Sequence, residues 1–324
     1  MAVLAGGAVF VALSACDAPF NLGQPSTRAL ENGASDSLSA AKSFEISGSY
    51  SESGDHWSID LQVARPASEH MTVSKADVNL EAIIVGNDAY FRGNQFLSQH
   101  MGSDTVSRNL VKAAGNAWWK GSADQVPRLT DLTDGAGFRA TFLGTAVSQR
   151  IDHVTVDGVE AVNLSGPRAD VFVAATPPYH LLRVHLKKDV VIDGIVEADF
   201  RFGKFDQDFQ IAAPKDVIDF SNLSTLPPIY TVLSVSSTQC GSPCVVSAKL
   251  KNLGGTRAAL GPSTITFTMT NSASGKSVGS CQVQVAPNVG YNATTTVSCP
   301  ISFDSGSQVS AAVVTAKADN PGGA

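Results

Sequence analysis

The fold is decided by residues 57–64, which read Trp57-Ser58-Ile59-Asp60-Leu61-Gln62-Val63-Ala64. Apolar residues alternate here with polar or small ones. Successive side chains of a strand point to opposite faces of a sheet, so the pattern predicts a strand with one buried and one exposed face. Strands of this kind are typical of an antiparallel sheet whose apolar face is covered by other elements.

The same alternation recurs on both sides of a central region with helical spacing. A short helix is predicted to begin near Asp36. Apolar residues at helical spacing predict helices over 95–115, 124–132 and 138–143, which could cover the sheet. Further strands are predicted over 71–78, 80–85, 89–92, 169–175, 181–187, 195–202 and 208–212, with a hairpin around Asp157-Gly158.

A second domain is predicted after Leu226-Pro227-Pro228, because consecutive prolines favour an extended linker and cannot continue a strand ladder. Short strands separated by turns follow. They are predicted over 230–235, 245–250, 263–269, 280–285, 292–297 and 308–317. So many short strands in one segment indicate an all-β sandwich.

The N-terminus carries an apolar run that ends in Leu13-Ser14-Ala15-Cys16. This ending resembles the lipobox of bacterial lipoproteins. It predicts a signal peptide over 1–15, lipidation of Cys16 and a polar tether over 16–35, and hence an exported protein anchored to the outer face of the cell membrane. The alternative is a short buried N-terminal segment. It is favoured by one observation, that no Lys or Arg lies between Met1 and Cys16.

The chain has five cysteines, and lipidation of Cys16 leaves an even number. The other four predict two disulfides formed in an oxidising compartment, with three possible connectivities. Spacing favours Cys240 with Cys244 and Cys281 with Cys299. A zinc site is the alternative. It is disfavoured because only one cysteine pair is closely spaced.

Composition and motifs argue against several classes of function. A net charge of -6 and the lack of a basic stripe exclude a nucleic-acid partner. The sequence has no nucleophile elbow and no zinc-protease histidine pair. The glycines around Gly135 match a dinucleotide fingerprint only in letters, since no strand is predicted before them. We therefore predict a protein that is not an enzyme and has no cofactor or metal.

Five short motifs carry a family resemblance: residues 117–120 (AWWK), 156–159 (VDGV), 179–184 (YHLLRV), 199–200 (DF) and 213–217 (APKDV). Over about 35–222 the chain resembles the LppX/LprG-like envelope lipoproteins. The resemblance implies a LolA-like fold, which is an α+β domain with a curved antiparallel sheet wrapped on helices and a cavity for acyl chains. Residues 248–255, 264–268 and 318–320 resemble CARDB-type immunoglobulin-like modules. The expected domains are 36–225 and 229–320.

The leading hypothesis is a lipoprotein that binds a lipid or another long apolar ligand, and possible carriage of that ligand between membranes follows from the family. Its partners would be the acyl ligand and the membrane, with protein partners left open. The alternative is a ligand-free scaffold or adhesion protein that acts through the C-terminal sandwich. For each candidate cavity residue, plain core packing is the other interpretation. These residues are Ile59, Leu61, Val63, Leu110, Trp118, Val184, Phe200 and Phe202.

Overall fold

The structure is a computed structural model that describes residues 24–76, 78–123, 129–143, 147–192, 194–238, 240, 243–303 and 312–323. Of these residues, 49% are in strands and 17% in helices. The chain divides into two compact units, each made of separate stretches. Unit 1 holds residues 1–41, 129–192 and 196–202, and unit 2 holds 42–128, 193–195 and 203–324. Cys16 and the predicted signal peptide lie outside the described residues.

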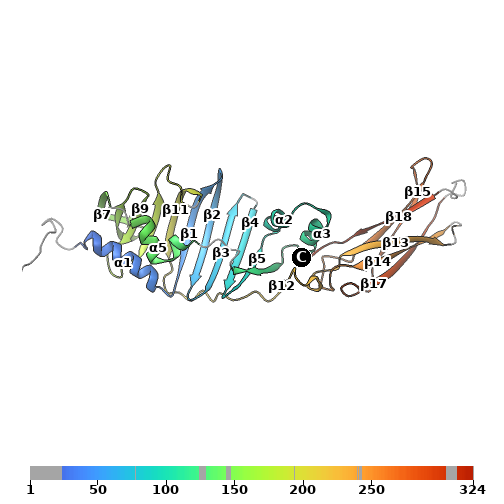
Figure 1. The fold of residues 1–324 in the computed structure, drawn as a ribbon, viewed down its shortest axis with the longest axis horizontal. Coiled ribbons are helices and arrows are strands. Elements are labelled where there is room, and N and C mark those ends of the chain that lie inside the picture. Colours follow the sequence, from blue (N-terminus) through green and yellow to red (C-terminus); the bar gives the residue numbers. More distant parts are fainter. Residues whose placement is uncertain are drawn as a thin grey trace, which may run out of the picture. The chain divides into compact units, whose positions relative to one another are not determined.

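Unit 1 combines α1 (Thr27–Ala40) with antiparallel strands (Figure 1). The hydroxyl of Ser26 caps α1 by accepting a hydrogen bond from the Ala29 amide, and α1 packs against α5, β9 and β10. The strands stand in the order β11-β10-β9-β8-β7. The elements are α4 (Thr130–Thr133), α5 (Gly135–Phe138), the π-helix η2 (Arg139–Leu143), β7 (Gln149–Val156), β8 (Val159–Ser165), β9 (Ala169–Ala174), β10 (Leu181–Leu186) and β11 (Ile195–Gly203).

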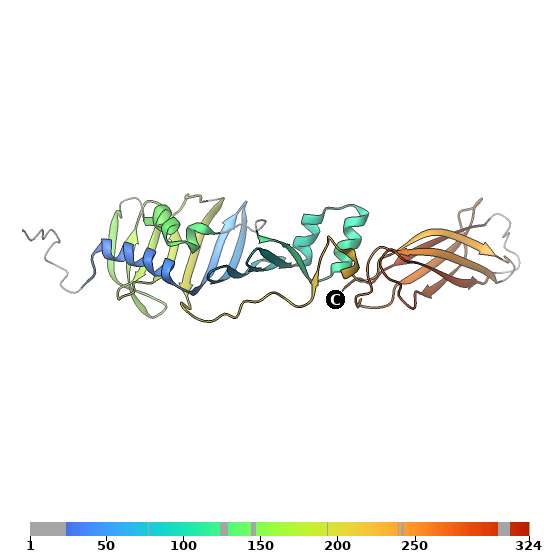
Figure 2. The same ribbon diagram turned by 60° about the horizontal axis from the view of Figure 1, so that its bottom comes forward.

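Unit 2 begins with a meander of strands connected by tight turns. Its strands stand in the order β12-β6-β5-β4-β3-β2-β1. An extended segment leads from β11 to β12 (Figure 2). The elements are β1 (Ser43–Glu52), β2 (Asp55–Ala64), β3 (Ser68–Lys75), β4 (Val78–Val85), β5 (Asp88–Arg92), α2 (Asn94–Met101), α3 (Thr105–Ala114), β6 (Trp118–Ser122), β12 (Val217–Ile218) and the 3-10 turn η3 (Leu223–Thr225).

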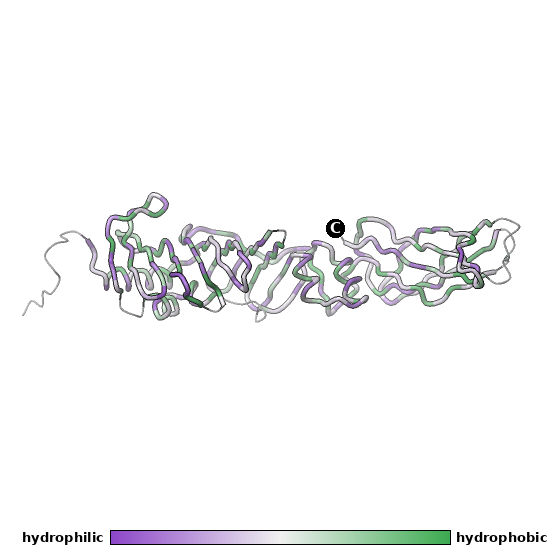
Figure 3. The backbone as a smooth tube through the Cα atoms, turned by 90° about the horizontal axis from the view of Figure 1, so that it is seen from above, coloured by the Kyte–Doolittle hydropathy of each residue, from purple (hydrophilic) through white to green (hydrophobic). Residues whose placement is uncertain are grey.

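The strand register of unit 2 gathers apolar side chains on one face of the sheet. Residues directly opposite one another on paired strands share a face. The alternation of hydrophobic and hydrophilic residues along the strands is visible in Figure 3. One line of paired residues crosses all seven strands, and we call it the apolar row: Ile46, Leu61, Met71, Ala82, Phe91, Trp119 and Ile218.

The last strands of unit 2 form two small antiparallel sheets, in the orders β13-β14-β17 and β16-β15-β18. They share one hydrophobic core, which includes Leu250, Phe267 and Ile301. Both favoured disulfides are confirmed. Cys240 bonds to Cys244, and Cys281 on β16 bonds to Cys299 on β17. The strands are β13 (Tyr230–Thr238), β14 (Cys244–Asn252), β15 (Thr264–Asn271), β16 (Ser277–Gln284), β17 (Thr294–Ile301) and β18 (Ala312–Asp319).

The predicted α+β fold class is wrong, because the chain is mostly β. The central helices are too short to form a layer that a sheet wraps around. The helix predicted over 138–143 is the end of the four-residue α5 followed by the π-helix η2, and the helix predicted over 95–115 is the pair α2 and α3. Short helices bury little apolar surface, so strand-to-strand pairing dominates the architecture.

Two local predictions also need correction. α1 starts at Thr27, so the helix expected near Asp36 begins earlier and residues 27–35 of the predicted tether are helical. The strand predicted over 208–212 is not a strand. It lies in the extended segment between β11 and β12, where the Gln210 amide donates to the Asp208 side chain. A local turn of this kind competes with ladder formation.

Candidate functional site

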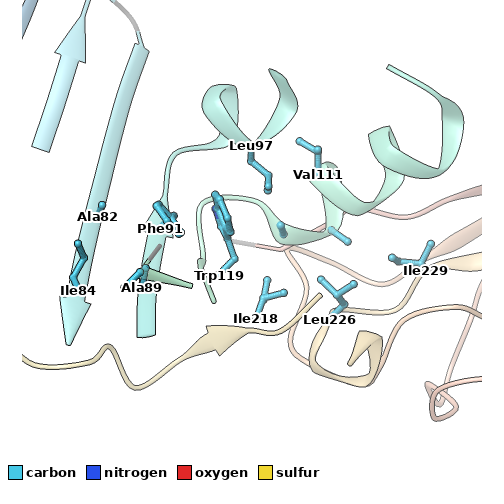
Figure 4. Packing of buried hydrophobic residues seen from close by; sticks show 13 residues of the cluster. Ala82, Ile84, Ala89, Phe91, Leu97, Val111, Trp119, Ile218, Leu226 and Ile229 are labelled. Atoms are coloured by element: carbon cyan, nitrogen blue, oxygen red, sulfur yellow. The ribbon is translucent and has the colours of Figure 1, made fainter. Parts of the chain in front are cut away.

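The candidate site is the end of the apolar face where α2 and α3 cover β4, β5 and β6. Its buried side chains come from the sheet, from the two helices and from the start of the C-terminal strands (Figure 4). We call this set the helix–sheet cluster: Ala82, Ile84, Ala89, Phe91, Leu97, Val111, Ala113, Ala114, Trp119, Ala123, Ile218, Leu226 and Ile229.

The indole of Trp119 lies among three phenylalanine rings. Its ring centroid is 4.6 Å from that of Phe91, 6.4 Å from that of Phe96 and 6.3 Å from that of Phe220. These separations are within the usual range for favourable aromatic pairs. The rings come from β5, α2 and the segment after β12, so one side chain connects the sheet to its cover.

A rim of partly exposed apolar residues surrounds the helix–sheet cluster. It consists of Met71, Leu80, Phe96, Met101, Leu110, Ala117, Phe220, Leu223 and Leu253. Such a rim is where an apolar ligand could contact the protein without unfolding its core. Val106 on α3 adds an apolar side chain that is 64% exposed. Contiguous exposed apolar surface on a soluble domain often marks an interaction site.

The structure separates the predicted cavity residues. Ile59, Leu61 and Val63 lie together on the apolar face of β2 and are buried. Leu110 lies on α3 in the rim. Val184 pairs with Phe200 across β10 and β11 in unit 1, where both are buried, and the ring of Phe202 meets that of Phe138 edge to face at 6.4 Å.

Trp118 points away from the apolar face. It precedes Trp119 on β6, and the Arg92 guanidinium lies 4.7 Å from its ring centroid in a cation–π contact. Alternation therefore places Trp119 on the apolar face and Trp118 on the opposite face. Of the two adjacent tryptophans, the predicted cavity residues include Trp118 and not Trp119, and they do not include Phe91. The signal that could have found Phe91 is the alternation of Ala89 and Phe91 with Tyr90 and Arg92 on β5.

The opposite face carries a hydrogen-bonded network of charged residues. Arg92 Nε donates to Glu81 Oε2 at 2.9 Å, and His70 Nε2 lies 2.8 Å from Glu81 Oε1. Burial on its own would raise the pKa of Glu81. The hydrogen bonds from Arg92 and His70 outweigh that effect, so the pKa of the Glu81 carboxyl lies below its usual value.

We expect this network to make the free energy of unfolding depend on pH. A carboxylate with a lowered pKa in the folded state stabilises at pH values above its ordinary pKa, and the contribution disappears as the pH falls through the folded-state pKa. Replacing Glu81 with Gln should cost about 1 kcal/mol at pH 7. It should also flatten the loss of stability between pH 5 and pH 3. Urea unfolding across that range measures both effects, with Glu31→Gln as the control. An unchanged pH slope would contradict the assignment.

Within the described part of the chain, no three His, Cys, Asp or Glu side chains are gathered to hold a metal ion. None of the described helices combines the length and apolar character needed to cross a membrane.

The sequence matches no family model and no curated protein. No family match therefore supports the resemblance to LppX/LprG-like lipoproteins or to CARDB modules. Among solved structures, a MucA/MucB complex of Pseudomonas aeruginosa is 12% identical, with 76% of this chain and 90% of that chain covered and a TM-score of 0.30. Another structure, MucB with MucA(peri), is 13% identical, with 79% and 90% covered and a TM-score of 0.27. At these scores the likeness carries no inference about this chain.

Proposed function

We propose that the protein is a non-enzymatic envelope lipoprotein, anchored through Cys16 outside the cell membrane, that binds a lipid acyl chain or a similar long apolar ligand on the apolar face of unit 2. The domain would work beside the membrane from which its ligand comes. Carriage of the ligand to another membrane is the corresponding activity.

The observation that supports this proposal is the apolar row. Its side chains cross seven strands without a polar residue. Met71 in its middle is only partly buried, and the rim continues from it to Leu80, Phe96 and Leu110. The other residues of the row are buried, so a ligand would lie against Met71 and these partly exposed side chains. Burial of each methylene is worth about 0.8 kcal/mol, so eight methylenes in contact with them contribute roughly 6 kcal/mol without any charged site.

Binding of cis-parinaric acid, a fatty acid that fluoresces in apolar surroundings, tests the proposal on the delipidated full chain. We expect saturable binding that Met71→Glu weakens at least tenfold, because a carboxylate in the row must lose its water when the acyl chain docks. Ser74→Glu is the matched control, since Ser74 lies on the same strand and on the opposite face. It should bind like the unmodified chain.

Lipids that co-purify with the chain from a native-like host provide a second measurement. Acyl species found by mass spectrometry on the unmodified chain and reduced on Met71→Glu support the proposal. Absence of both probe binding and bound lipid would reject it in favour of the scaffold. Equal binding by the Met71 and Ser74 variants would place the ligand elsewhere on the molecule.

A further inference from the structure

The helix pair α2–α3 is held by contacts at its ends as well as by its apolar face. α2 begins after Gly93, which has no side chain that could cap the helix. The side-chain Nδ2 of Asn94 donates at 2.9 Å to the Gly115 carbonyl, directly after α3, so the start of one helix is connected to the end of the other. The two helices are therefore connected to each other as well as to the sheet.

The segment after β18 docks on the last turn of α3. The Gly323 amide donates to the Ala113 carbonyl at 2.9 Å and to the Lys112 carbonyl at 3.3 Å. The last carbonyls of a helix lack partners within the helix, so this amide satisfies groups that would otherwise need water. Lys112 Nζ lies 3.0 Å from Asp319 Oδ1, which adds an exposed ion pair to the contact.

Glycine is required at this contact for steric reasons. A Cβ atom on Gly322, whose φ is +90°, would lie 2.1 Å from the Lys112 carbonyl oxygen. A Cβ atom on Gly323 would lie 2.5 Å from the Ala113 carbonyl oxygen. Both distances are far shorter than a nonbonded contact allows, so the backbone of the segment approaches α3 as closely as only glycine permits.

The same segment is fixed to the C-terminal strands. The Asn320 side chain accepts from the Tyr230 amide at 2.9 Å and donates to the Tyr230 carbonyl at 3.1 Å. The Leu260 amide donates to the Gly322 carbonyl at 2.9 Å. In addition, Leu226 and Ile229 belong to the helix–sheet cluster. α3 is thus attached through hydrogen bonds and apolar packing to the module formed by β13–β18.

We infer that the C-terminal module is a clamp that holds α2–α3 over the apolar face, and that release of the segment 320–323 from α3 lets the helix pair move away from β4–β6. The role of this movement in ligand access rests on the proposed function. The clamp itself does not, since it concerns only the stability of the helix pair on the sheet. Local opening of this kind costs less free energy than unfolding of the whole domain.

Hydrogen–deuterium exchange of the full chain without ligand tests the clamp. In the double variant Gly322→Ala/Gly323→Ala, amides of residues 94–114 should exchange at least tenfold faster, while those of β14 and β15 should exchange at the unmodified rate. Gly261→Ala is the matched control, because a Cβ atom there would meet its nearest neighbour, on Pro321, at an ordinary 3.8 Å. It should leave both regions unchanged.

The clamp is overturned by an unchanged rate in 94–114, or by acceleration of β14 and β15 to the same extent, which would mean that the module as a whole is loosened. The rate of cis-parinaric acid uptake by the same samples separates the two proposals. Faster exchange in 94–114 without probe binding by any variant supports the clamp and rejects the proposed ligand binding. Probe binding with unchanged exchange keeps the ligand and rejects the clamp.

Discussion

Asn252→Leu is expected to lower the free energy of unfolding of unit 2 by about 4 kcal/mol, because it leaves four backbone groups without their side-chain partner, and three of these bonds are buried. Asn252 ends β14, and its side chain is fully buried. Its Oδ1 accepts from the amides of Ile229 at 2.9 Å and Gly254 at 3.0 Å. Its Nδ2 donates to the carbonyls of Gly255 at 2.9 Å and Val289 at 2.7 Å.

Urea unfolding followed by tryptophan fluorescence measures this effect, since the three tryptophans, Trp57, Trp118 and Trp119, all lie in unit 2. Asn109→Leu on the exposed side of α3 is the control and should change stability by less than about 0.5 kcal/mol. Asn252→Asp keeps the acceptor but sets a carboxylate oxygen against the carbonyl oxygens of Gly255 and Val289, so it should lose at least as much as Asn252→Leu. A loss below about 1 kcal/mol for Asn252→Leu would contradict the account.

Asn252 also shows why the boundary between the sheet and the C-terminal strands could be predicted only in part. The prolines at 227 and 228 correctly indicate that no ladder passes through them. They do not show that Leu226, Ile229 and Tyr230 are buried. That burial depends on Gly254 and Gly255, which approach the linker so closely that a Cβ atom would overlap the carbonyl oxygens of Pro227 and Ser224. Contacts between residues this far apart in the chain produce no pattern in the local sequence.

The strands were predictable because their signal is local. Alternation over residues 57–64 places Ile59, Leu61 and Val63 on one buried face, as β2 has them. The middle of the chain was harder. Apolar residues at helical spacing over 138–143 are compatible with one helix. The structure instead has the short α5 followed by a π-helix, and in this arrangement Phe138 packs against Phe142 and Phe202. Which structure forms there depends on contacts with residues far along the chain, and the periodicity of a short segment carries no information about those contacts.

The candidate site has the same limit. Alternation states that Trp118 and Trp119 face opposite ways, but it does not state which of them joins the apolar face. The choice is made by the register of β6, which sets Trp119 opposite Phe91 on β5 and Ile218 on β12. β12 lies about a hundred residues further along the chain. The alternation therefore applies to both tryptophans. Only the pairing of β6 with β5 and β12 shows that Trp119 is the one on the apolar face.

This difference between neighbouring tryptophans leads to a strong prediction. Trp119→Ala should lower the free energy of unfolding of unit 2 by about 4 kcal/mol, because it opens a cavity among three aromatic rings. Trp119 is 7% exposed, and its neighbours Phe91 and Ile218 are buried as well. Trp119→Phe keeps part of the ring packing and should lose less than half as much.

Trp118→Ala is the matched control, one residue away on the same strand. It removes a half-buried ring and its cation–π contact with Arg92, which is worth about 0.5–1 kcal/mol at such a site. We therefore expect a loss near 1 kcal/mol in urea unfolding, against the fourfold larger loss at Trp119. Equal losses at the two positions would mean that the register of β6 is shifted by one residue, which would turn Trp118 toward the apolar face and Trp119 away from it.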